Sequence, residues 1–207
     1  MRQTIFEFCG FTAHCVFEIG VPSKLSFHIG RIHLTDDSEY TQKFNAEDVI
    51  LHPDFKGTRI DNDIALIKLA GKIKLTKSVA VRVKSSARTE RSLGLASPKQ
   101  KLYRKKTLEQ TLVDVVDALT CISSDCDVLG IQLTTNMICA RGQEGACSGD
   151  SGGGMFFKIK DSWLVRGIAS FTTRKIIDGL CDPSVYTVYT DRAKYMAWIA
   201  DARLYNR

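Results

Sequence analysis

A glycine-rich stretch, Gly149-Asp150-Ser151-Gly152-Gly153, is the part of the sequence best suited to chemistry. Glycine lets the backbone approach a bound group closely, so main-chain N–H groups in such a stretch can point at the oxygen of a reacting carbonyl. The hydroxyl of Ser151 is a weak nucleophile alone and requires a base and an acid that orients the base. A plain loop between strands is the alternative, and it loses weight if a histidine and an aspartate occur in matching surroundings.

Two other segments supply such partners. His14 lies in Phe-Thr-Ala-His-Cys at 11–15, which we interpret as the end of a buried strand that runs into a tight turn. Asp63 directly precedes an apolar run of the kind that strands show. A carboxylate buried at a strand entrance is costly without a donor, so we expect Asp63 to accept a hydrogen bond from an imidazole N–H. His52, followed by a proline, is expected in a loop and outside the chemistry.

Short alternating apolar segments must position these residues. The pattern predicts strands near residues 25–30, 32–34, 49–51, 64–69, 112–116, 136–140, 155–159, 163–171 and 185–189. Residues 118–126 are expected to form a short helix or turn. Tyr195, Trp198, Ile199 and Ala202 recur on one face of a terminal helix. Many short strands with one helix predict an all-β fold, either two packed antiparallel barrels or a sandwich.

Basic residues are concentrated between Lys72 and Lys106, where twelve Lys or Arg residues accompany a single acid, Glu90. The stretch has no clear periodicity, which favours a solvated connecting segment. The alternative is a site for an anionic glycan of the heparin kind. Its candidate residues are Lys101, Arg104, Lys105 and Lys106. Nucleic acid is disfavoured because aromatic residues, which stack on bases, are nearly absent from the stretch.

The composition sets further bounds. The 207 residues, 44% hydrophobic and 25% charged, are ordinary for one globular domain, and no apolar run is long enough to cross a membrane. The first eight residues do not resemble a secretory leader, because Glu7 interrupts the apolar run. The seven cysteines have no CxxC spacing, so we expect no metal site and no cofactor. Several disulfides and at least one unpaired thiol are the simpler account, which indicates an oxidising compartment.

In the order His, Asp, Ser, three segments resemble the motifs of the chymotrypsin-like (trypsin-fold) serine endopeptidases. They are Thr-Ala-His-Cys at 12–15, Asp-Ile-Ala-Leu at 63–66 and Gly-Asp-Ser-Gly-Gly at 149–153. The run Gly-Gly-Gly-Met-Phe-Phe at 152–157, with Gly154 where the family usually has proline, is similar to invertebrate clotting and immune-cascade proteases.

This resemblance implies two packed antiparallel six-stranded Greek-key barrels with a C-terminal helix. It implies that Ser151 attacks the peptide carbonyl, that His14 transfers the proton, and that Asp63 orients His14. The N–H groups of Gly149 and Ser151 would form the oxyanion hole. Asp150 would pair with the ammonium of an activated N-terminus. Disulfides Cys121–Cys139 and Cys147–Cys181 are implied, with Cys9 and Cys15 as a further candidate pair and Cys126 as the odd thiol.

The resemblance also indicates the pocket for the side chain that precedes the cleaved bond. Gly145 stands where trypsin-like members have an aspartate, so we expect a preference for small or medium uncharged residues. Glu144, one residue further away, is the less favoured route to basic specificity. The remaining pocket residues would be Ala146, Ser170, Phe171, Thr172 and Ser184, the last two narrowing the opening.

The larger departures from the family pattern lie in the N-terminal half and in its connection to the C-terminal half. No Ile-Val-Gly-Gly-type terminus precedes Cys9, and only five residues separate Cys9 from Cys15. We therefore expect an incomplete N-terminal barrel at residues 1–75, a basic connecting segment at 76–106, a C-terminal barrel at 107–189 and a helix at 190–207. Protein substrates, protein protease inhibitors and a secreted location would follow from the resemblance. A catalytically impaired homologue or fragment that acts as a binding or cascade cofactor is the alternative.

Overall fold

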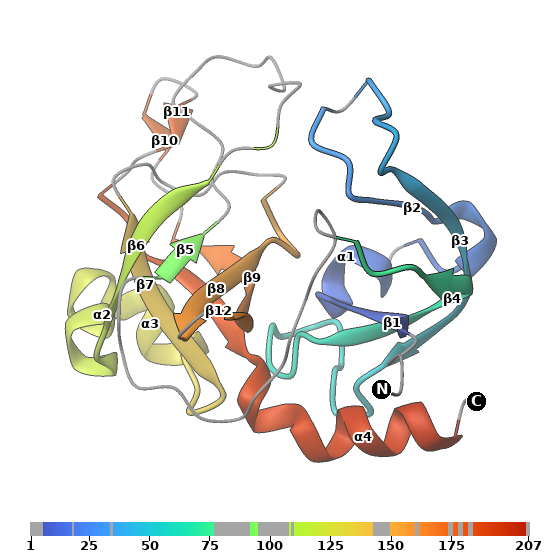
Figure 1. Ribbon diagram of the computed structural model, residues 1–207. Coiled ribbons are helices and arrows are strands. Elements are labelled where there is room, and N and C mark those ends of the chain that lie inside the picture. Colours follow the sequence, from blue (N-terminus) through green and yellow to red (C-terminus); the bar gives the residue numbers. More distant parts are fainter. Residues whose placement is uncertain are drawn as a thin grey trace.

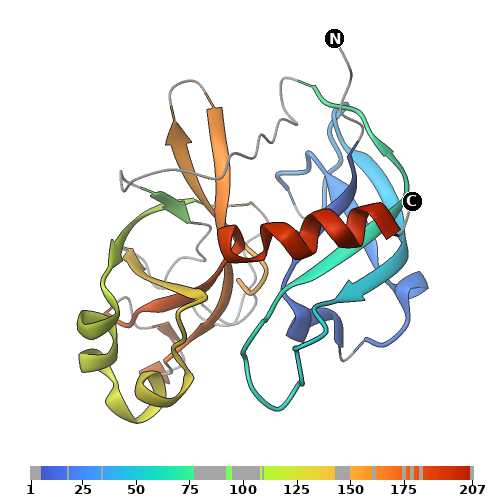
Figure 2. The ribbon, with the colours of Figure 1, turned by 90° about the horizontal axis from the view of Figure 1, so that it is seen from below.

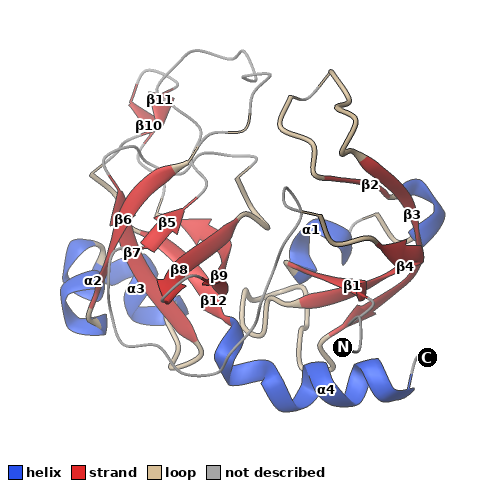
Figure 3. Cartoon of the chain, viewed as in Figure 1, coloured by secondary structure: helices blue, strands red, loops and turns tan. Residues whose placement is uncertain are grey.

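The chain folds into two β-rich halves that lie side by side, with a helix running beneath one of them (Figures 1 and 2). The computed structural model describes residues 6–17, 19–33, 35–76, 92–94, 108, 110–142, 150–159, 162–173, 176–177, 180–181 and 184–205. Side chains are described for these residues except at 6–9, 92–94, 162, 176–177 and 180–181. Figure 3 shows that strands dominate both halves. The prediction of an all-β fold with a C-terminal helix is therefore confirmed.

The N-terminal half is a four-stranded antiparallel sheet in the order β1-β4-β3-β2. Its strands are β1 (Phe6–Phe11), β2 (Ser26–Ile29), β3 (Gln42–Leu51) and β4 (Ala65–Ile73). β4 lies in the interior of the sheet, and its side chains from Ala65 to Ile67 and Leu69 are almost completely buried. Burial on both faces explains why this segment reads as a nearly continuous apolar run.

The C-terminal half is a closed barrel in the order β12-β7-β6-β5-β8-β9. Its strands are β5 (Ser92–Gly94), β6 (Thr111–Val116), β7 (Met137–Gly142), β8 (Gly154–Ile159), β9 (Ser162–Thr172) and β12 (Thr187–Asp191). A small hairpin of β10 (Ile176–Ile177) and β11 (Leu180–Cys181) projects beside it. Each of the six strands pairs with a neighbouring strand on both sides.

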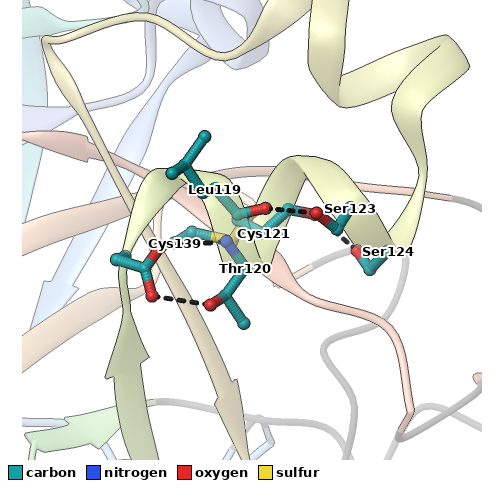
Figure 4. The surroundings of a disulfide bond; sticks show 7 residues. Leu119, Thr120, Cys121, Ser123, Ser124 and Cys139 are labelled. Atoms are coloured by element: carbon teal, nitrogen blue, oxygen red, sulfur yellow. Dashed lines mark hydrogen bonds between the residues drawn. A yellow bond between two sulfur atoms is a disulfide. The ribbon is translucent and has the colours of Figure 1, made fainter.

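Short helices begin where an aspartate caps them. Asp117 accepts a hydrogen bond from Thr120 N at 2.9 Å and starts α2 (Ala118–Ser124), and Asp125 accepts from Val128 N at 3.2 Å and starts α3 (Cys126–Gln132). The disulfide Cys121–Cys139 joins α2 to β7 (Figure 4), as the resemblance implied. The remaining helical pieces are α1 (Ala13–Phe17), the 3₁₀ turns Pro22–Lys24 and Arg192–Tyr195, and α4 (Met196–Tyr205).

Helix α4 runs along the underside of the N-terminal sheet, although it follows the barrel in sequence (Figures 1 and 2). Tyr195, Ile199 and Ala202 are buried against Leu66 of β4 and against Ile64, which directly precedes β4. Ile168 of β9 packs into the same cluster, so the cluster joins both halves. The residues predicted from helical spacing thus form the face that holds the halves together. No described helix is long and apolar enough to span a membrane.

Three local expectations differ from the structure. Ala13–Phe17 form a helical turn where a tight turn was expected. His33 forms an isolated bridge within the predicted strand at 32–34. Ser92–Gly94 form barrel strand β5, which pairs with β6 and β8, although the sequence assigned them to the connecting segment. A three-residue strand is too short to show an apolar alternation, which explains why the pattern missed it.

Candidate functional site

His14 and Asp63 meet at the edge of the N-terminal half that faces the barrel. Asp63 lies two residues before β4 and is fully buried, whereas the His14 side chain, in α1, is 34% exposed. Nδ1 of His14 lies 2.7 Å from Oδ2 of Asp63, and the backbone N–H of His14 donates to Oδ1 at 2.8 Å. The two contacts fix both the position of α1 and the orientation of the imidazole ring.

The barrel supplies two more contacts to Asp63. Ser170 Oγ, in β9, donates to Oδ2 of Asp63 at 2.5 Å, and Thr190 Oγ1, in β12, donates to its backbone carbonyl at 2.9 Å. Both hydroxyls are buried. A buried carboxylate is tolerated when several donors satisfy it, so the bond from Ser170 stabilises the Asp63 carboxylate as an acceptor for His14, while the bond from Thr190 holds the Asp63 backbone. The aspartate thus links the two halves of the molecule.

Ser151 lies in a turn that is attached to the same barrel strand. Gly152 N donates to the carbonyl of Ala169 at 2.8 Å, and Ala169 N donates to the carbonyl of Gly153 at 2.8 Å. Ala169 directly precedes Ser170, the residue that binds Asp63. Gly152 also has a φ of +86°, and a Cβ there would lie 2.7 Å from the ring of Phe11, at the end of β1. The Ser151 turn is therefore anchored beside the segment that carries His14.

On the other side of the imidazole, Nε2 of His14 lies 3.3 Å from Sγ of Cys15. Cys15 is a free thiol in the structure, which does not agree with the candidate pairing of Cys9 and Cys15. No hydrogen bond joins Ser151 to His14 within the described part of the chain. The hydrogen bond with Asp63, followed by the one with Cys15, raises the pKa of His14 to about 10.

The structure describes Asp150 and some of the expected pocket residues. Burial raises the pKa of Tyr189 to about 12, and the negative charge of Asp150 nearby acts in the same direction. Phe171 and Thr172 are half-buried on β9, and Ser184 is exposed. Gly145, Ala146, Cys147 and Gly149 lie outside the described residues, and Cys181 is described only as part of β11. Cys126, expected as the odd thiol, is free and exposed.

Sequence reasoning missed the contact of Ser170 with Asp63. The sequence placed Ser170 in the wall of the pocket, whereas its hydroxyl binds the carboxylate. One signal was present, because Ser170 follows the apolar pair Ile168-Ala169 on a strand whose face is buried. A hydroxyl at such a position needs a buried partner. Among the described residues, no cluster of three or more His, Cys, Asp or Glu side chains suits a metal ion.

Comparisons with known proteins match most of the chain. The family model Trypsin matches residues 12–199. The chain is 27% identical to vitamin K-dependent protein C of Oryctolagus cuniculus over 202 residues, which are 90% of this chain and 42% of that protein. It is 30% identical to CLIP domain-containing serine protease B4 of Anopheles gambiae over 217 residues, 91% of this chain and 57% of the relative.

A third relative is closer to this chain in length. Chymotrypsin-like elastase family member 1 of Felis catus is 27% identical over 200 residues, which are 90% of this chain and 71% of the relative. The chain thus spans about half the length of the first two relatives and more of the third. The prediction from the three motifs is confirmed: the chain belongs to the trypsin family, a family of serine endopeptidases, which are hydrolases.

Proposed function

We propose that the chain is a serine endopeptidase domain in which His14, Asp63 and Ser151 form the catalytic triad. The observation that carries the proposal is the buried Asp63 carboxylate, bound by His14 at 2.7 Å and by Ser170 of the strand that anchors the Ser151 turn. A buried acid that orients an imidazole beside a glycine-rich serine turn is the arrangement that acyl transfer requires.

In the proposed reaction, Ser151 Oγ attacks the carbonyl carbon of a peptide bond while its proton passes to Nε2 of His14. Asp63 holds the Nδ1–H and stabilises the imidazolium that forms. The N–H groups of Gly149 and Ser151 would stabilise the oxyanion, by about 3 kcal/mol for each donor. His14 then gives the proton to the leaving amine, and water, activated by His14, hydrolyses the acyl-enzyme.

The cleavage preference is proposed from the sequence of the pocket. Gly145 takes the place of the acid that selects Lys or Arg, and Thr172 and Ser184 add bulk at the opening. We therefore expect cleavage after small or medium uncharged residues. A panel of peptides that differ only in the residue before the cleaved bond tests this preference. Cleavage solely after Arg or Lys would contradict it and would point to Glu144.

A fluorophosphonate probe tests the central assignment, because it reacts only with an activated serine. We expect an adduct on Ser151, located by mass spectrometry of the labelled peptide. The adduct should be lost in Ser151→Ala and reduced by about three orders of magnitude or more in His14→Ala. Ser123→Ala is the control, because Ser123 is exposed on α2, where its hydroxyl donates to the carbonyl of Leu119. Labelling that survives His14→Ala would contradict the proposal.

A second candidate function is that of a catalytically impaired homologue that binds a partner. The observation that favours it is the position of Nε2, which faces Cys15 and has no hydrogen bond to Ser151 within the described residues. Substrate binding must free this nitrogen before it can accept a proton from Ser151. A chain that binds peptides but gives no Ser151 adduct at any pH from 6 to 10 would support the binding function.

Protein substrates follow from the proposed activity, and protein protease inhibitors and a secreted location are proposed with it. Glycan binding is a separate proposal, because Lys101, Arg104, Lys105 and Lys106 lie outside the described residues. Retention on immobilised heparin tests it. Retention at the same salt concentration after all four residues are neutralised would exclude this site.

A further inference from the structure

The backbone around Asp63 forms a tight turn. The N–H of Ile64 donates to the carbonyl of Asn62 at 2.7 Å, so Asp63 is the central residue of a three-residue turn. The carbonyl of Ile64 in turn accepts from His52 N at 3.1 Å. Because the backbone conformation limits the rotamers of a side chain, the turn at residues 62–64 decides in which direction the Asp63 carboxylate points.

Asn62 has the unusual conformation in this turn. Its φ is +55°, and among the described residues it is the one residue other than glycine with a positive φ. The left-handed region is unfavourable for most L-residues, and asparagine tolerates it because its short side chain can form hydrogen bonds there. A residue in this region keeps its conformation when the surrounding structure holds it in place. The contacts of the Asn62 side chain therefore matter for the residue that follows it.

The contact to the Asn62 side chain comes from the C-terminal end of the chain. Oη of Tyr195 donates to Oδ1 of Asn62 at 3.1 Å. Tyr195 ends the 3₁₀ turn Arg192–Tyr195, directly before α4, and is 5% exposed. Its ring packs in the cluster that contains Ile64, and the ring of His52 meets it edge-on with 5.2 Å between the centroids. A tightly packed aromatic residue thus holds the side chain of the left-handed residue.

The protonation state of Tyr195 suits a donor. Burial raises the pKa of Tyr195 to about 12, although a hydrogen bond with Asn136 acts against this change. The negative charges of Asp61, Asp63 and Asp191 act in the same direction as burial. The phenol therefore keeps its proton at neutral pH and donates it to the amide oxygen.

We propose that Tyr195 is a positioning residue for the peptidase reaction and acts through Asn62 on the direction of the Asp63 carboxylate. The Tyr195 phenol holds the Asn62 side chain, and the Asn62 carbonyl closes the turn around Asp63. The carboxylate then meets Nδ1 of His14 at 2.7 Å. The start of α4 is in this way connected to the groups that would transfer the proton. The effect on catalysis rests on the proposed function, whereas the alignment of Asp63 with His14 does not.

The pKa of His14, followed by NMR titration of the imidazole C–H signals, measures this alignment without any need for activity. The hydrogen bond with Asp63 contributes most to the raised pKa of His14, and Cys15 is the other titratable group that acts on it. Tyr195→Phe keeps the ring and removes the oxygen atom. We expect the proton affinity of His14 to fall by about ten-fold in this variant, with the His28 titration unchanged. A general loss of stability would not change the pKa of His14 in molecules that remain folded.

Tyr186→Phe is the matched control. It removes the same oxygen atom from a tyrosine that is 8% exposed, directly precedes β12 and packs in a different cluster, with Leu129 and Val188. The His14 titration should not change in this variant. An unchanged His14 titration in Tyr195→Phe, or an equal fall in both variants, would overturn the proposal.

A double-mutant cycle tests the path through Asn62. Asn62→Gly removes Oδ1 and leaves the left-handed conformation accessible, and we expect it to lower the proton affinity of His14 by about the same ten-fold. Tyr195→Phe added to Asn62→Gly should cause no further fall, because the contact is already absent. A second ten-fold fall would show that Tyr195 acts by another route and would overturn the path. Asn62→Gly retains the phenol, so it also tests the proposal if Tyr195→Phe does not fold.

The second readout is the rate of fluorophosphonate addition to Ser151 across the pH range. In Tyr195→Phe the plateau rate should fall by about ten-fold, and the midpoint of the pH profile should move to lower pH together with the His14 titration. An unchanged plateau rate with a shifted titration would overturn the effect on catalysis. Absence of any Ser151 adduct in the unmodified chain would instead contradict the proposed function, and the His14 titration would still decide the positioning.

Discussion

The two halves of the molecule contribute to the candidate site in different ways. The N-terminal half is an open four-stranded sheet and presents His14 and Asp63, whereas the C-terminal half is a closed barrel and presents the Ser151 turn. The closed barrel satisfies its own strand edges, but the open sheet depends on α4 and β9 for part of its burial. The acid of the open half is itself held by Ser170 and Thr190 of the barrel. The open half is therefore positioned by the closed one.

A large effect on Ser151 is expected from adding one methyl group at the contact between the halves. In Gly152→Ala, the new Cβ would lie 2.7 Å from the ring of Phe11, at a φ of +86°. We expect the left-handed conformation to cost about 1–2 kcal/mol and the overpacking to cost about 1–3 kcal/mol, and we expect these two costs to add to each other. We expect Ser151 labelling to fall by about 100-fold.

Gly20→Ala is the matched control for this change. Gly20 has a φ of +63° but nothing within 4 Å of an added Cβ, so this variant imposes the strain without the clash. It should lower the free energy of unfolding by about 1–2 kcal/mol and leave labelling unchanged. Equal losses of labelling in the two variants would show that the contact between Gly152 and Phe11 does not position the serine.

Ion pairs provide a second contrast between the halves. In the barrel, Arg166 binds Asp191 through two contacts, Nε–Oδ1 at 2.5 Å and Nη2–Oδ2 at 2.8 Å, and the Asp191 side chain is only 5% exposed. Arg166→Met leaves that carboxylate buried without its ion pair. We expect the free energy of unfolding to fall by about 3 kcal/mol, measured by urea denaturation.

The pair in the N-terminal half should contribute much less. The side chain of Arg59 is 62% exposed where it meets Asp61, so Arg59→Met should cost no more than about 1 kcal/mol. If both variants are destabilised equally, burial does not distinguish the two pairs.

Helix α4 allows the dependence of the open sheet to be measured directly. Ile199 is 4% exposed and packs with Ile64 and Leu66, so Ile199→Ala should destabilise the protein by about 2–4 kcal/mol. Amide hydrogen exchange should accelerate in β4 more than in β7. Leu204→Ala is the control, since Leu204 is 58% exposed on the same helix and should change stability by less than about 0.5 kcal/mol. Equal acceleration of amide exchange in both halves of Ile199→Ala would show that the open sheet does not depend on α4 more than the barrel does.

The smallest effect is the pH dependence of the same helix contact. Burial lowers the pKa of His52. The centroid of its ring lies 5.2 Å from that of Tyr195 and 5.0 Å from that of Trp198. The folded state favours the neutral ring. The contribution of His52 to the free energy of unfolding is therefore complete above the unfolded pKa of about 6.5, and it is lost as the pH falls through the lowered pKa. The raised pKa of His14 has the opposite sign, so its contribution is lost as the pH rises toward 10.

Urea titrations at pH 4.5 to 7.5 measure this effect. In His52→Gln, the fall in stability toward acid pH should be shallower than in the unmodified protein. An unchanged slope would show that His52 does not report on the helix contact.

The sequence predicted those elements whose residue pattern has one physical explanation. The apolar run at 64–69 predicted β4, whose two faces are both buried. The spacing of Tyr195, Ile199 and Ala202 predicted α4, because burial of one helix face imposes a period. The turn around Gly152 was predicted as a site where the backbone approaches another group closely, and in the structure Gly152 has a positive φ.

Contacts between segments far apart in the chain were beyond such reasoning. The bond from Ser170 to Asp63 joins residues 107 positions apart, and the sequence had no signal for that distance. The state of Cys15 was also missed, because a cysteine beside a histidine suggested a disulfide by resemblance, whereas the helical turn of α1 brings its Sγ next to Nε2.

The most direct test of the central claim compares two aspartates on one loop. Asp63 is buried and binds His14, whereas Asp61 is paired with Arg59 at 3.0 Å, and its side chain is 32% exposed. The rate of fluorophosphonate addition to Ser151 should fall by about three to four orders of magnitude in Asp63→Asn and by no more than about two-fold in Asp61→Asn. Equal rates in the two variants would show that the acid on the open sheet does not serve the serine on the closed barrel.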